Sequence, residues 1–264
     1  MKLNVNWKRT FLVCADIAIG GYLFMALTAW HRPVQESSVC TKVVINIADD
    51  NINGFLNSDE VKTLLTRKGL YPLNHPTATV NPRKIEQQLV TMPFVKTAQC
   101  YLTTDGHAFV TITQNLPIIR VKSDQGEDYY VDANGGVMPN SQYTSDMIIV
   151  TGHVSKTYAN RFLAPLAQVI MDNDLWRNQI EQINVLPDLS IELVPRVGDH
   201  IVCIGQLPSA ASEHARNEKI KDFVNNQLTR LEQFYRFGLA HAGWNKYDYI
   251  SLEYANQVVC RKRG

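Results

Sequence analysis

Residues 94–114 read FVKTAQCYLTTDGHAFVTITQ and hold two runs of β-branched and aromatic residues on either side of Asp105-Gly106. An Asp-Gly pair between two such runs is a strong signal for a β-hairpin, because both residues tolerate the positive φ that a tight turn requires. The stretch therefore predicts two antiparallel strands, over residues 94–102 and 108–114.

The sequence before this hairpin predicts one strand and two helices. Residues 42–48 (KVVINIA) are β-branched and typical of a strand. Residues 57–60 (NSDE) supply a capping side chain and two acids at the positive end of a helix dipole, and this helix is expected to stop at Gly69. A second helix is expected between Asn81 and Pro93. The resulting β-α-α-β-β unit covers residues 42–115.

Residues 116–264 predict a second, mixed α/β domain on an antiparallel-rich sheet, so the fold class is α+β. Two helices are expected, near residues 157–172, where Pro165 predicts a kink or a late start, and near residues 217–237. Strands are expected over residues 118–121, 129–131, 147–151, 179–185, 189–194, 200–204 and 247–260.

The N-terminal segment predicts a membrane anchor. Residues 11–30 are mainly apolar, and about 20 such residues span a bilayer. Lys8 and Arg9 precede this run, which favours a cytoplasmic N-terminus. We expect a cytoplasmic tail over residues 1–10, a transmembrane helix over residues 11–30 and a linker over residues 31–41. The residues expected to anchor the helix are Phe11, Leu12, Ile17, Ile19, Leu23, Phe24, Leu27 and Trp30.

Two features of this segment have alternative interpretations. A cleaved signal peptide is the rival to an anchor, but its apolar core usually has only ~7–15 residues. Asp16 is either a tolerated acid near the cytoplasmic end or a contact with the membrane helix of a partner.

Charge and cysteine usage limit the possible functions. The net charge is +1, with basic clusters at both ends and a net acidic body between them, which argues against a nucleic-acid partner. The five cysteines have no zinc-type spacing. Four of them, Cys40, Cys100, Cys203 and Cys260, follow the anchor, where disulfides are permitted but not required.

The sequence contains no recognisable catalytic or metal-binding motif, neither HExxH, nor GxSxG, nor a phosphate-binding glycine loop. Asp124, Glu127 and Asp128 are a cation site or, as we favour, a solvated hairpin tip. Residues 132–135 (DANG) lack the distal Glu of a calcium loop and predict a turn. We therefore expect no catalytic residue, no metal and no cofactor, and a protein that works by binding other proteins.

The order of these elements resembles the FtsQ/DivIB family of bacterial cell-division proteins, whose POTRA domain the β-α-α-β-β unit is similar to. The motifs that carry the resemblance are FVKTA (94–98), AFVTI (108–112), LPI (116–118), YYVDANGGVMP (129–139), IVTG (149–152), ISLEY (250–254) and QVV (257–259). One departure is Glu253, since many relatives carry a basic residue before the Tyr.

The resemblance implies a non-enzymatic scaffold of the divisome, anchored in the inner membrane at the division site with its folded part in the periplasm. It implies that the POTRA domain and the membrane helix help recruitment. It also implies that the C-terminal domain binds bitopic coiled-coil division proteins of the FtsB/FtsL type, chiefly by adding a partner strand to its last strand.

The partner-binding residues expected in that last strand are Tyr254, Ala255, Asn256, Gln257, Val258 and Val259. This stretch has no Pro and no charge, so nothing blunts an exposed edge, and Tyr254 is the expected anchor. The alternative is that the strand is paired inside the sheet and that Tyr254 belongs to the core. The basic residues that follow, Arg261, Lys262 and Arg263, either keep the edge soluble or attract an acidic partner segment.

Two other functions compete with this interpretation. The first is a POTRA-containing component of outer-membrane protein transport or assembly, although the helices expected near Leu163 and Leu228 interrupt the strand series that it requires. The second is a secreted enzyme such as a cell-wall hydrolase, which needs a cleavable signal and a convergent polar site.

Overall fold

The computed structural model of the chain describes residues 7–30, 39–48, 55–141 and 147–264. The chain divides into two compact units. The first comprises Met1–Asn46, Asp59–Gln88 and Ala98–Thr111, and the second comprises Ile47–Ser58, Leu89–Thr97 and Ile112–Gly264.

The N-terminal segment forms helix α1 (Trp7–Trp30), which contains the whole of the expected anchor. Among the residues that the structure describes, no helix meets the combined length and hydropathy requirement for crossing a membrane. The side chains of Leu27 and Trp30, most of the cytoplasmic tail and most of the linker lie outside what the structure describes.

A three-stranded sheet with two helices follows, and the predicted β-α-α-β-β order is confirmed. The strands lie in the order β1-β3-β2. Glycine and asparagine set the helix ends as expected: Gly69 has φ +66° after the first helix, and Asn81 Oδ1 accepts a hydrogen bond from Lys84 N (3.2 Å) at the start of the second. The elements are β1 (Lys42–Ala48), α2 (Ser58–Arg67), the short 3₁₀ helix η1 (Thr77–Thr79), α3 (Pro82–Leu89), β2 (Val95–Leu102) and β3 (His107–Gln114).

The remainder of the chain builds a nine-stranded sheet in the order β12-β11-β10-β9-β8-β7-β4-β5-β6. Five neighbouring pairs are antiparallel, whereas β4–β7, β7–β8 and β10–β11 are parallel. The predicted antiparallel-rich, mixed sheet is therefore confirmed. The strands are β4 (Pro117–Ser123), β5 (Asp128–Asp132), β6 (Val137–Pro139), β7 (Ile148–Gly152), β8 (Ile180–Val185), β9 (Ser190–Pro195), β10 (Ile201–Gln206), β11 (Tyr247–Ser251) and β12 (Val259–Lys262).

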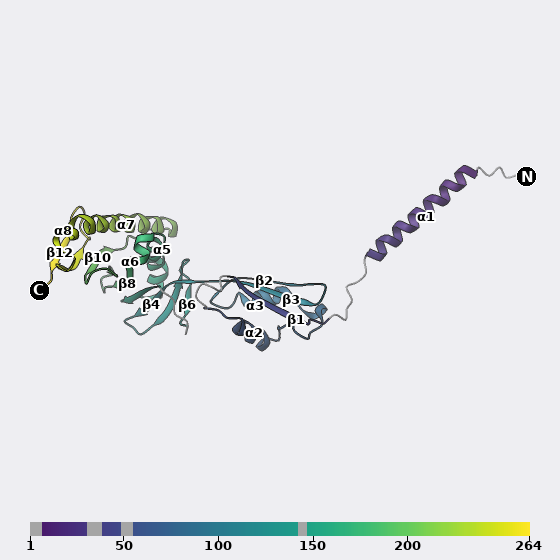
Figure 1. Cartoon of the computed structure of the whole chain (residues 1–264), viewed down its shortest axis with the longest axis horizontal. Coiled ribbons are helices and arrows are strands. Elements are labelled where there is room, and N and C mark those ends of the chain that lie inside the picture. Colours follow the sequence, from purple (N-terminus) through teal and green to yellow (C-terminus); the bar gives the residue numbers. More distant parts are fainter. Residues whose placement is uncertain (1–6, 31–38, 49–54, 142–146) are drawn as a thin grey trace, which may run out of the picture. The chain divides into compact units, whose positions relative to one another are not determined.

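Helices cover one side of this sheet, with α5 and α7 lying along it (Figure 1). Leu166 of α5 and Leu228 of α7 belong to one buried cluster with the sheet residues Val150 and Val202. The helical elements are α4 (Lys156–Tyr158), the π-helix η2 (Ala159–Leu163), α5 (Ala164–Met171), α6 (Asp174–Gln179), α7 (Glu213–Gln233), the π-helix η3 (Phe234–Leu239) and α8 (Ala240–Ala242).

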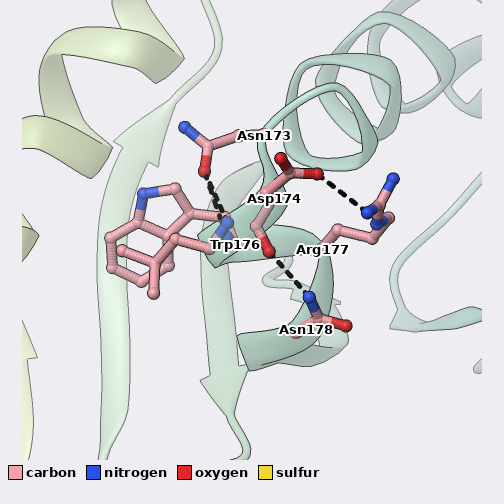
Figure 2. Close-up of polar contacts among 6 residues, drawn as sticks. Asn173, Asp174, Trp176, Arg177 and Asn178 are labelled. Carbon is pink, nitrogen blue, oxygen red and sulfur yellow. Dashed lines mark hydrogen bonds and ion pairs between the residues drawn. The ribbon is translucent and has the colours of Figure 1, made fainter.

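Two predictions about the helical elements require correction. The single helix expected over residues 157–172 is divided into α4, η2 and α5. The π-helical turn ends at Leu163 and α5 begins at Ala164, in agreement with the late start expected at Pro165. Proline has no amide hydrogen and its ring collides with the preceding turn, so the helix widens there instead of running straight. Helix α6 was not predicted; Asn173 begins it by accepting hydrogen bonds from Leu175 N (3.0 Å) and Trp176 N (3.2 Å), as Figure 2 shows for Trp176.

The acidic residues that could have held a cation have protein partners. Asp124 pairs with His153 (3.2 Å), and Glu127 with Lys156 (2.7 Å). Arg120 bonds to Asp128 (2.6 Å) and holds the pKa of that carboxyl below its ordinary value. This supports the hairpin-tip interpretation. In the DANG stretch, Asp132 Oδ1 accepts from the amides of Asn134 and Gly136, both at 2.8 Å, and so forms the predicted turn.

A buried aromatic cluster joins α6, η3 and the start of β10. His200 is only 3% exposed, and its Nε2 lies 2.7 Å from Tyr235 Oη. The ring of Tyr235 contacts Trp244 at 5.0 Å and Trp176 at 6.1 Å between centroids. Burial, and next the positive charge of Arg263, lower the pKa of His200.

This cluster should make stability depend on pH. A histidine with a lowered pKa in the folded state binds a proton more readily when unfolded, so the free energy of unfolding falls as pH drops below ~6.5 towards the folded pKa. The aspartates with lowered pKa titrate at more acidic pH and do not act in this window. We expect His200→Gln to reduce the loss of stability between pH 7.5 and 5.5, measured by urea unfolding with tryptophan fluorescence. His153→Gln, at an exposed site, is the control; equal pH dependence in both variants would contradict the assignment.

Candidate functional site

The two edges of the nine-stranded sheet differ in how well they are protected. At one edge, β6 has only three residues and ends on Pro139, which has no amide hydrogen to offer. At the other edge, β12 is free of proline. An unprotected edge presents unpaired backbone groups to another strand, so β12 is the edge suited to a partner.

The structure corrects the expected position of this edge strand. Tyr254, Ala255, Asn256 and Gln257 are not in a strand but form the turn between β11 and β12, and Val258 precedes β12. Only Val259 of the expected set lies in β12. The strand is broken because Asn256 has φ +60°, a left-handed conformation that Asn tolerates better than most residues.

The exposure of these residues decides between the two interpretations of Tyr254. Tyr254 is 55% exposed and Val259 is 46% exposed, whereas Val258 packs against the core. The alternative that Tyr254 belongs to the core is therefore wrong. Its side chain stands at the surface, at the start of the turn that leads to the edge strand.

The pairing of β11 with β12 shows which backbone groups face outward. Ile250 lies opposite Cys260, and Arg263 N donates to Lys246 O at 3.0 Å. Because backbone groups alternate in direction along a strand, the N–H and C=O of Cys260 and Lys262 point away from β11. These are the groups that an added strand would meet.

Salt bridges engage most of the basic residues at this edge. Arg261 bonds to Asp248 (2.8 Å) and holds the pKa of that carboxyl below its ordinary value. Arg263 donates to Asp199 O (2.6 Å) and lies 3.3 Å from its carboxylate. Two of the three terminal cations therefore tie the edge strand to its own domain.

An arginine from the long helix holds the β11–β12 turn, residues 254–257. Arg230 Nη1 donates to Leu252 O (2.8 Å), and its Nη2 donates to Tyr254 O (2.8 Å) and Gln257 O (2.7 Å). A groove of about 680 Å³ lies between this turn and the end of α7, and Phe237 at its wall is 72% exposed. The site thus combines an open strand edge with apolar surface beside it.

Sequence reasoning missed Arg230, its neighbour Gln227 and Phe237. A signal for the first two was present, because both occupy positions on the stripe of α7 that otherwise carries apolar residues such as Leu228 and Leu231. A polar side chain on an inward stripe needs a hydrogen-bond partner, and the backbone of the following turn provides it.

Two domain families match the chain. Residues 38–113 match the POTRA-like domain, and residues 116–261 match the family described as FtsQ/DivIB, C-terminal related. Both are non-catalytic, scaffold-type domains. No curated protein matches the chain. The second match alone spans more than half of the 264 residues, and the chain therefore belongs to the FtsQ/DivIB family.

Proposed function

We propose that this chain is a non-enzymatic scaffold of the bacterial divisome that recruits and binds other septal membrane proteins through its extracytoplasmic domains. Its family and its POTRA-like domain fit a division-related scaffold. The observation that carries the proposal is the proline-free edge strand β12, which follows a turn that carries the exposed Tyr254 and that lines one groove with the exposed Phe237.

The mode of binding is strand addition by bitopic coiled-coil division proteins of the FtsB/FtsL type. A partner segment would hydrogen-bond along β12, which gives affinity, and place alternate side chains against the domain, which gives specificity. Tyr254 and Phe237 offer large apolar contacts of the kind that dominate binding energy at interfaces. The direct test is co-purification of FtsB-type and FtsL-type proteins with the full chain from membranes of dividing cells.

Tyr254→Ala should lower the affinity for this partner by about thirtyfold, equal to ~2 kcal/mol of binding free energy. The free energy of unfolding should change little, because the side chain is exposed in the free protein. Isothermal titration against the extracytoplasmic part of the FtsB-type protein gives the affinity. Tyr101→Ala is the control, since Tyr101 is also 53% exposed but lies in β2. Equal affinity of both variants for the partner would show that the Tyr254 side chain does not contribute to binding.

We further propose that α1 anchors the chain in the inner membrane with the N-terminus in the cytoplasm. Lys8 and Arg9 lie in the first turn of the helix, before its apolar run, and apolar side chains are exposed along that run. The exposed anchor residues are Phe11, Leu12, Ile17, Ile19, Leu23 and Phe24.

This anchor should survive in the mature protein. We expect intact-mass spectrometry of the chain from inner-membrane fractions to show an uncleaved N-terminal segment, because the apolar run is longer than that of a signal peptide. A mature N-terminus near Trp30 would contradict the anchor. Recovery in the outer-membrane fraction would instead favour the POTRA-containing transport component.

A further inference from the structure

The β11–β12 turn depends on one side chain that is distant in sequence. Arg230 supplies hydrogen bonds to three carbonyl groups, those of Leu252, Tyr254 and Gln257, which together span the turn. The left-handed residue Asn256 lies between the last two. A single guanidinium group thus holds both ends of a segment that leads directly into β12.

A buried glutamine fixes the direction of this guanidinium. Gln227, one helical turn before Arg230, is 4% exposed, and its Oε1 accepts from Arg230 Nη1 at 2.6 Å. Its amide nitrogen donates to Ile204 O (3.1 Å) and Leu252 O (3.2 Å). The pair therefore ties α7 to β10, to the end of β11 and to the turn.

We propose that Arg230 is a positioning residue for partner binding: together with Gln227 it holds the β11–β12 turn, and so the edge of β12, in the conformation that the partner strand requires. This inference rests on the proposed function of that edge. When the edge is already ordered in the free protein, binding does not carry the entropy cost of ordering it, and the affinity is higher for that reason. Arginine is required because two separate nitrogens of its planar fork donate to these carbonyls, whereas lysine has one nitrogen and cannot occupy both positions.

The test uses the full chain in detergent micelles, the purified extracytoplasmic part of the FtsB-type protein as the probe, and the variant Arg230→Lys. We expect affinity to fall by about tenfold to one hundredfold. We also expect amide hydrogen exchange over residues 254–262 to become faster in the free variant and to return to the wild-type rate in the saturated complex. A merely structural role would speed exchange in β9 and β10 of the free variant as well as over residues 254–262.

Arg236→Lys is the matched control, because Arg236 also lies near the end of the long helix but pairs with Glu232 instead of the turn. Arg230→Gln serves as a second variant, with unchanged exchange in β9 and β10 as proof of folding. Wild-type exchange over residues 254–262 in folded Arg230→Lys would overturn the inference whatever the partner does. If Arg230→Lys binds the partner with wild-type affinity while Tyr254→Ala binds it more weakly, the inference about Arg230 is overturned and the proposed function stands.

Discussion

We expect Cys260→Pro to abolish binding of the proposed FtsB-type partner, a loss of at least about one hundredfold, and Cys260→Ala to retain it. The register with β11 shifts between Tyr247 and Tyr249, but β12 is continuous. Alternation along β12 from Arg263 N, which donates to Lys246 O, therefore points the backbone N–H of Cys260 away from β11. Proline removes this donor from the edge but leaves the inward hydrogen bonds of the neighbouring residues in place. Titration of both variants with the partner, together with their unfolding midpoints, measures the effect.

The alanine variant separates the backbone from the side chain. Cys260 packs against the core, so either substitution loses that contact. Only proline loses the amide hydrogen, and the difference between the two variants therefore reports strand addition alone. A folded Cys260→Pro protein that binds as tightly as Cys260→Ala would exclude β12 as the partner edge.

Gly152→Ala should lower the free energy of unfolding by about 3 kcal/mol or more. Gly152 closes β7 with φ +91°, and a Cβ atom there would lie 2.2 Å from Val185 O and 2.7 Å from Asn184 Oδ1. The first of these is a backbone atom of the neighbouring parallel strand, so it cannot swing aside. Urea unfolding of the variant gives the value.

Gly126→Ala is the control for this prediction. Gly126 has φ +82°, but a Cβ there meets nothing within 4 Å. That variant should show the backbone strain alone, about 1 kcal/mol. Equal losses in the two variants would mean that the approach of Val185 O does not constrain position 152.

The elements with local signals could be predicted from the sequence. The Asp-Gly hairpin, the stop at Gly69 and the helix start near Asn81 each depend on signals within a few residues, and the structure has them where they were expected. Helix α6 was missed because it has only six residues and its sequence overlaps a strand-like run. The split before Pro165 was predicted as a kink or a late start, but the π-helical turn was not, since the widened turn depends on packing.

The partner edge could be predicted as a feature of the last strand but not placed correctly. Residues 254–259 have strand-like composition, and no local pattern shows that Asn256 is left-handed. The hydrogen bonds that hold the turn come from Arg230, more than twenty residues earlier. Long-range contacts of this kind are not encoded in a local pattern. The resemblance to a family indicated the function of the last strand but not the conformation of the turn before it.

The parallel pairing of β10 with β11 has a consequence for the order of folding. Parallel neighbours cannot be joined by a tight turn, so the chain between Gln206 and Tyr247 must cross back through α7 before β11 can dock. Closing such a loop costs entropy before any contact compensates for it, which slows assembly. Since α7 also carries Arg230, docking of this helix and ordering of the β12 edge occur together. We therefore expect a chain in which α7 has not docked to lack a finished edge for pairing with other strands.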